Sequence, residues 1–227
     1  DISSEKVPRR HGVYITEEPT LGARTLTFQG FIKGATAAAV RATLDTLMHI
    51  LDGPRGKLYL NGTSGRYINC TKKDFSHHPV AGTTLLAWLY TVTFFADDPF
   101  WYEAPAVSHP HVVGTSPSTW TETNAGVQQQ YPTITIAADQ ATDVVTFTLA
   151  NTTTSQTMTY AGTITSGNSL VIDTANFTIA NNGTSDWAQT TGELLNLNPG
   201  ANSLSFTGNN CTITIAYKNR YNSPAFD

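Results

Sequence analysis

The alternation of apolar and polar residues is most informative in the stretch from Thr84 to Tyr102. Every second residue from Leu86 forms one set of side chains, and every second residue from Leu85 forms the other. Both sets are largely apolar. A strand with two apolar faces is typical of a position covered on both sides. The residues Asp97–Pro99 then end the pattern, because paired acids resist burial and proline lacks the N–H that a ladder needs. We therefore expect Thr84–Phe95 to be a strand in the interior of a domain.

The segment before this strand predicts an α+β layer. Arg24–Phe31 alternates as a half-buried strand, and Val13–Ile15 is a shorter candidate in a loop-like start. Thr36–Leu51 carries apolar residues at helical spacing, and Thr36 is a suitable N-cap. We expect this one helix to pack on the sheet that the neighbouring strands form.

Two short strands, Lys57–Leu60 and Tyr67–Thr71, are expected between the helix and the interior strand. The dipeptide Asn61-Gly62 between them is a strong hairpin signal. Residues 72–83 are polar, with histidine, proline and glycine, and predict a loop.

The second half of the chain has a different pattern, with short alternating strands separated by turn residues and no helix. This is typical of a two-sheet sandwich. We expect an N-terminal α+β domain at 1–105, a linker rich in Pro, Ser and Thr at 106–123, and a C-terminal β-sandwich at 124–227. The expected sandwich strands are Tyr131–Ile136, Val144–Leu149, Thr157–Gly162, Ser169–Asp173, Phe177–Ala180, Leu194–Leu197, Asn202–Thr207 and Thr212–Tyr217.

Composition supports this division and excludes some partners. The chain is 40% hydrophobic but only 13% charged, and Thr, Asn, Ser and Gly fill the difference, which favours strands and turns. The net charge of −4 argues against a protein that reads nucleic acid by sequence. The first half is near neutral and the second is acidic. No apolar run is long enough for a transmembrane helix, and no leader sequence is visible.

The search for catalytic or metal-binding chemistry gives no candidate. His77-His78 and His109-Pro110-His111 lack a third ligand at a sensible spacing, so we interpret them as solvated loop residues. Adjacent residues of a strand point to opposite faces, so Asp97 and Asp98 do not form a carboxylate pair. There is no phosphate loop and no nucleophile motif. We expect no enzyme, cofactor or metal, and we expect Cys70 and Cys211 to be buried thiols.

Exposed aromatic residues leave a second interpretation open. A sandwich with Trp120, Trp187, Tyr160 or Tyr217 on one face would suit carbohydrate stacking. Such a chain would be a carbohydrate-binding module for attachment to a host cell surface. Core packing is the competing role for each of these side chains.

Several segments together resemble the distal tail protein family of siphoviruses, the long-tailed, non-contractile bacteriophages. The strand Arg24–Gly30, the helix Thr36–Leu51 with the strand that follows it, and the closing strand Trp88–Trp101 are similar to that family's first domain. The second half has similar segments in the same order. These are Asn124–Gly126, Tyr131–Ile134, Tyr160–Gly162, Leu170–Asp173, Leu197–Asn202 and Thr212–Tyr217.

The resemblance implies a structural virion protein of the tail tip, assembled in the host cytoplasm. It implies a homohexameric ring made by the N-terminal (belt) domains, with galectin-like sandwiches on the outside. The ring would join the tail tube protein to a tail-tip hub or fibre protein and surround a channel for DNA, without binding DNA by sequence and without a membrane. For the ring contacts we name Phe100, Trp101, Tyr102, His77 and His78, which lie at strand ends and in an expected loop.

Two departures from the family pattern affect these expectations. The family normally begins with a further strand, and Asp1 starts after that point. Some members carry a long arm or an inserted sugar-binding domain within the sandwich. The loops of this chain are short, so we expect neither feature here.

Overall fold

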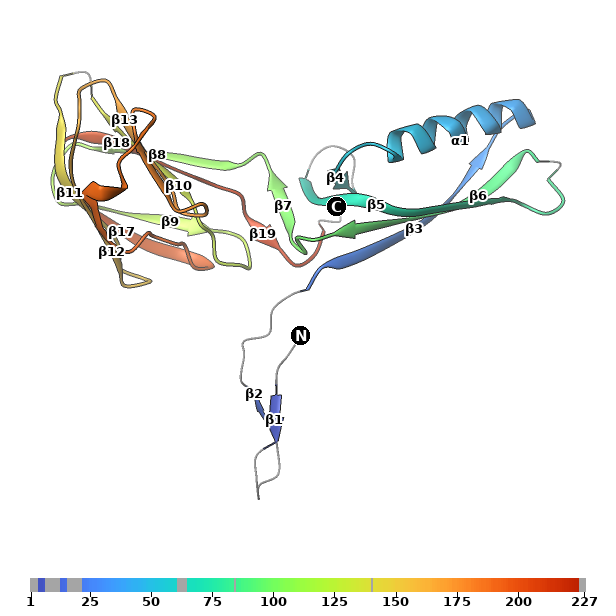
Figure 1. The fold of residues 1–227 in the computed structure, drawn as a ribbon, viewed down its shortest axis with the longest axis horizontal. Helices are drawn as coiled ribbons and strands as arrows, with labels where there is room; N and C mark the ends of the chain where they lie inside the picture. The colour runs from blue at the N-terminus through green and yellow to red at the C-terminus, as the bar shows by residue number, and fades with distance from the viewer. Residues whose placement is uncertain are drawn as a thin grey trace. The chain divides into compact units, whose positions relative to one another are not determined.

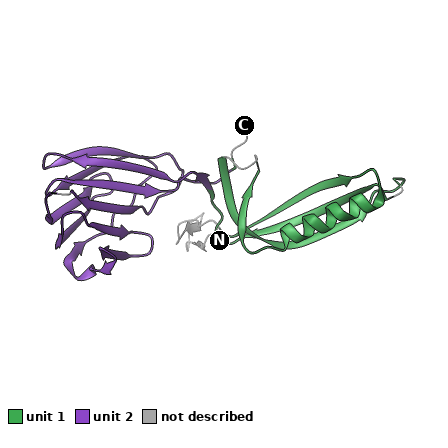
Figure 2. Ribbon diagram, turned by 90° about the horizontal axis from the view of Figure 1, so that it is seen from above, with its two compact units in different colours: residues 1–101, 224–227 green, residues 102–223 purple. Residues whose placement is uncertain are grey.

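A computed structural model gives the structure of residues 4–6, 13–15, 22–60, 65–83, 85–139 and 141–224. The chain divides into two compact units, residues 1–101 with 224–227 and residues 102–223 (Figure 2). The expected mainly β fold is confirmed, and α1 (Ala37–Leu51) is the one α-helix among the described residues.

The first unit places one helix over a sheet of long strands (Figure 1). The helix begins where the sequence predicts, because the Thr36 side chain accepts a hydrogen bond of 3.1 Å from the Ala39 N–H. Within this unit the neighbouring strands of the sheet are β5-β6-β3, and β4 pairs with the beginning of β5. The strands of this unit are β1 (Ser4–Lys6), β2 (Val13–Ile15), β3 (Arg24–Lys33), β4 (Gly56–Tyr59), β5 (Gly65–Pro79) and β6 (Ala87–Ala96).

Two expectations for this unit are wrong. Most of the polar segment 72–83 is strand, because β5 continues to Pro79 in antiparallel pairing with β6. The β6 strand is covered on one face only, since Leu89 and Phe95 are 40% and 43% exposed. Its second apolar face has no cover in the part of the chain that the structure describes. Thr84 and the Asn61-Gly62 turn lie outside the described residues.

The second unit is the expected β-sandwich. One sheet has the order β15-β14-β13-β10-β18-β8, and the other has the order β16-β12-β11-β17-β9. Inward residues alternate along each strand and form one core, in which Ile134, Phe147 and Phe206 are at most 1% exposed. Cys70 in the first unit and Cys211 in this core are free and buried, as expected.

The elements of the second unit follow one another closely. They are β7 (Trp101–Ala104), β8 (Val107–Val113), β9 (Ser118–Asn124), β10 (Thr133–Ala138), β11 (Val144–Asn151), β12 (Gln156–Ile164), β13 (Ser169–Asp173), β14 (Thr178–Asn181), β15 (Thr184–Ser185), the 3-10 helix η1 (Trp187–Gln189), β16 (Thr190–Gly192), β17 (Gly200–Thr207), β18 (Cys211–Tyr217) and β19 (Arg220–Tyr221).

The segment 106–123, expected to be a linker, instead supplies one edge strand to each sheet of the sandwich. β8 pairs with β18, and β9 pairs with β17. The sequence does not predict β9, because the alternation of apolar and polar residues is broken there. Two of its inward positions hold polar residues, Glu122 and Asn124, which are 3% and 1% exposed. Leu194–Leu197 is not a strand and makes only an isolated bridge between Leu197 and Gln130.

Candidate functional site

The histidines that the sequence singles out lie on strands, not in loops. His109 and His111 are on β8, where His109 Nδ1 lies 2.7 Å from Glu122 Oε1 and the His111 ring stacks on Trp120 at 4.2 Å. Both side chains therefore join β8 to β9, the edge strands of the two sheets. Among the described residues, no group of three His, Cys, Asp or Glu side chains could hold a metal ion, and no helix is long and apolar enough to cross a membrane.

The aromatic residues considered for sugar stacking do not form a row. Tyr160 is 0% exposed and Tyr217 is 6% exposed, so both belong to the core. Burial and the neighbouring Asp186 carboxylate raise the pKa of Tyr160 to about 12. Burial and Glu122 likewise raise the pKa of Tyr217, whose hydroxyl donates to Glu122 Oε1 at 2.8 Å. Trp187 is 47% exposed and stands on η1, directly after Asp186, the hydrogen-bond partner of Tyr160.

The sheet of the first unit is a better candidate for a contact surface than the sandwich, because α1 covers one of its faces and leaves the other exposed. On one face, Val40 and Leu44 of α1 pack on Ile32 of β3 and on the aromatic residues Phe75, Trp88 and Tyr90 of β5 and β6. This face exists because β3 and β6 align over ten residue pairs, from Arg24↔Ala96 to Lys33↔Ala87, which keeps their apolar positions in register.

The opposite face of this sheet has no cover among the described residues, and we call it the open face. Its side chains are mostly uncharged, with Phe31, Leu89 and Phe95 standing out as exposed apolar groups at 69%, 40% and 43%. Lys33 and Asp74 are its charged residues, and His78 adds an imidazole. The open face comprises Thr25, Thr27, Gln29, Phe31, Lys33, Thr71, Asp74, Ser76, His78, Ala87, Leu89, Thr91, Thr93 and Phe95.

The same sheet has two edges that the first unit does not pair. β3 is the outermost strand, and only its β6 side is hydrogen-bonded among the described residues. On the other side, Phe75–Pro79 of β5 pair with β6, whereas β4 reaches β5 only at Tyr67–Cys70. Unpaired edges are templates for another strand, and soluble proteins usually cover them.

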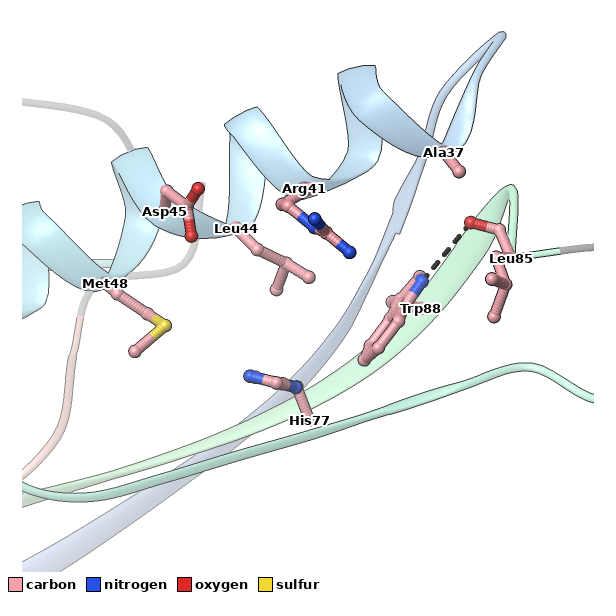
Figure 3. Close-up of a pocket in the computed structure, with 8 residues that line it drawn as sticks. All are labelled: Ala37, Arg41, Leu44, Asp45, Met48, His77, Leu85 and Trp88. Carbon is pink, nitrogen blue, oxygen red and sulfur yellow. Dashed lines mark hydrogen bonds between the residues drawn. The ribbon is translucent and has the colours of Figure 1, made fainter.

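A cavity of about 220 Å³ lies beside the β5 edge, under one flank of α1 (Figure 3). Leu44, Met48 and Trp88 give it an apolar lining, and Arg41, Asp45 and His77 add polar groups. The Trp88 indole N–H is held by the Leu85 carbonyl at 3.2 Å, so this ring is fixed in the wall. The cavity is smaller than the pockets that usually bind drug-sized ligands or cofactors.

The five residues named for ring contacts fall in different environments. His77 lines the cavity on the helix side of β5, with its ring 5.3 Å from that of Trp88, whereas His78 lies on the open face. Trp101 is 2% exposed and serves the fold rather than a partner. Phe100 and Tyr102 are partly exposed, and Arg220 lies over the Tyr102 ring at 5.8 Å. The sequence did not point to the β3 edge or to the cavity.

Comparison with known proteins relates the chain to phage tail proteins in two ways. Residues 125–221 match the family model described as "Siphovirus-type tail component, C-terminal domain". The crystal structure of the SPP1 Dit protein, described as a paradigm of the hub adsorption apparatus in phages that infect Gram-positive bacteria, superposes with a TM-score of 0.75. That match has 15% sequence identity and covers 97% of this chain and 87% of the other. No curated protein matches the sequence. The resemblance to siphovirus distal tail proteins is therefore confirmed.

Proposed function

We propose that this chain forms a homohexameric adaptor ring at the tip of a phage tail. Its C-terminal domain matches a siphovirus-type tail component, and its fold is that of a phage distal tail protein, so it is a structural component of the tail. The first units form the ring, and the sandwiches lie on its outside. The ring joins the tail tube protein to the tail-tip hub or fibre protein and surrounds the DNA channel. It assembles in the host cytoplasm and has no catalytic role.

The observation that carries this proposal is the fold similarity to a hub adsorption protein over nearly the whole chain. The similarity includes both units, so the combination of a helix-covered sheet and a sandwich is shared and not only one common module. Fold alone does not determine function, and the properties of the first unit therefore matter.

The two free edges of the first unit support a ring. A closed ring of identical copies needs two different, complementary surfaces on each copy. The outer edge of β3 and the Phe75–Pro79 edge of β5 lie on opposite sides of one sheet and can provide these two surfaces. Joining the sheets edge to edge would also cover both of these unpaired edges.

The open face supports the role of a channel lining. A strongly basic lining would hold DNA through its phosphates, and each phosphate contact would add to the affinity. Lys33 is the only lysine or arginine that strand pairing assigns to the open face, and the exposed Lys73 lies in the β-bulge between Lys72 and Asp74. Uncharged polar side chains, from threonine, serine and glutamine, lie on this face beside the exposed Phe31, Leu89 and Phe95. Such a face is wetted by water and holds a passing polyanion weakly.

The named contact residues stay part of the proposal, except for one. We keep Phe100, Tyr102, His77 and His78 as contacts, because each has exposed surface. Trp101 is buried, so its truncation would open a cavity in the fold and would not report on assembly. For the carbohydrate-binding alternative, two of the four aromatic residues, Tyr160 and Tyr217, are core residues and so do not stack on a sugar.

The deciding experiment is the mass of the purified chain by light scattering after size exclusion, with negative-stain images of the same peak. We expect hexamers with an open centre, either alone or after addition of the tail tube and hub proteins. A chain that remains monomeric with both partners present would overturn the proposal. In that case a glycan array would test the sandwich as a binding module.

A further inference from the structure

The direction of the strands limits how the ring contact can be made. β3 and β5 are each antiparallel to β6, so they run in the same direction. Neighbouring copies in a cyclic ring are related by rotation about the channel axis, which preserves the direction of each strand relative to that axis. If the sheets continue from copy to copy, β3 of one copy must therefore meet β5 of the next in parallel.

We propose that the cavity beside α1 is a socket for the β3 strand of a second copy. This inference rests on the proposed ring and names its contact. The partner strand pairs with the outer edge of Phe75–Pro79, and its helix-side residues Leu26 and Phe28 close the cavity. The socket is the cavity lined by α1, His77 and Trp88 as described above.

This contact is supported by the side of the sheet on which the residues of β3 and β5 lie. His77 is on the helix side of β5 and also lines the cavity. In β3, Leu26 and Phe28 are on the helix side, because they pair with Phe94 and Val92 of β6. Side chains of paired strands on one face lie about 5 Å apart, so these β3 residues would stand over the cavity mouth next to His77.

The size of the cavity agrees with a second copy as the occupant. The cavity of about 220 Å³ accepts one or two side chains rather than a cofactor. β3 carries Arg24 and Lys33 and no acidic residue. The receiving side carries both signs, with Asp45 and Arg41 at the cavity and Lys73 and Asp74 on β5, so Asp45 and Asp74 are the carboxylates that the incoming positive charges can meet.

Disulfide trapping tests the strand faces. In the full chain, His77→Cys combined with Leu26→Cys or with Phe28→Cys should form intermolecular disulfides under mild oxidation and give covalent ladders up to the hexamer. His77→Cys combined with Thr27→Cys is the matched control, because Thr27 lies on the open face. The single variants measure any background from the native cysteines, which are both buried.

Filling the socket tests the cavity. Ala37 lines the cavity and its neighbour Ala38 does not, and both are exposed on α1. Ala37→Phe should weaken the ring, with at least a tenfold rise in the concentration at which it dissociates, while Ala38→Phe should leave it unchanged. Circular dichroism would establish that both variants fold.

The outcomes separate this inference from the proposed function. Rings that form normally but cross-link equally through Thr27, or that tolerate Ala37→Phe, would overturn the socket and leave the adaptor ring intact. A chain that never forms rings with its tail partners would overturn the proposed function itself.

Discussion

At the residue scale, Gly192 is the position where one methyl group should cost most. Its φ is +90°, and a Cβ there would lie 2.2 Å from the Thr157 carbonyl oxygen of β12. Gly183, with φ of +78° and nothing within 4 Å of its Cβ, has the strain without the clash. We expect Gly183→Ala to lower the free energy of unfolding by about 1–2 kcal/mol and Gly192→Ala by clearly more. Urea denaturation of both variants measures the difference, and equal losses would contradict the clash.

Tyr160 should make the sandwich sensitive to alkali. Its pKa is raised to about 12 in the folded chain, so the neutral phenol is favoured there. The stability from this group is fully present below the unfolded-state pKa of about 10 and is lost as the pH rises from about 10 to about 12. Tyr160→Phe should flatten the fall in the free energy of unfolding over this window. Tyr131→Phe, at a 43% exposed tyrosine, should keep the wild-type slope.

At the scale of elements, the cap of α1 offers a paired test within one helix. The Thr36 hydroxyl accepts from the Ala39 N–H, whereas the Thr43 hydroxyl donates to the Ala39 carbonyl inside the helix. Thr36→Ala should cost about 1 kcal/mol, and Thr43→Ala should be neutral or stabilising because alanine has the higher helix propensity. Urea denaturation and hydrogen exchange at Ala39 would measure both effects. A destabilising Thr43→Ala would contradict the assignment.

The elements also show what periodicity can and cannot predict. α1 and β13 were predictable because an N-cap with an apolar stripe and a simple alternation are local signals. β9 was not, because Glu122 and Asn124 occupy inward positions and find their partners on distant strands and loops. β6 reveals a different limit. Its two apolar faces predicted a strand covered on both sides, but the described residues cover only one face.

The candidate site was less predictable than the fold. Strand edges and the cavity arise from the tertiary pairing of β3, β5 and β6, and no local pattern encodes them. His77 was singled out for its position in an expected loop, and its place at the cavity follows from β5 being a long strand instead. Trp101 was chosen for an aromatic strand end, and such ends are also where a domain buries its large side chains.

At the scale of the whole molecule, the proposed ring makes the open face responsible for releasing DNA. Replacing Thr91 of β6 by lysine would place an additional positive charge on this face in every copy of the ring. Each copy would then offer a phosphate contact, and bound DNA would resist release most at low salt. Thr46→Lys, at an exposed position of α1, adds the same charge on the other side of the sheet.

Phage particles carrying each variant would therefore separate the two faces. We expect Thr91→Lys to slow DNA ejection, with the delay reduced at high salt, while Thr46→Lys ejects DNA at the normal rate. Equal rates in both variants would mean that the open face does not line the channel. A delay that salt leaves unchanged would point to obstruction by the longer side chain, since only a phosphate contact is screened by ions. The salt dependence thus distinguishes an electrostatic lining from a merely narrower one.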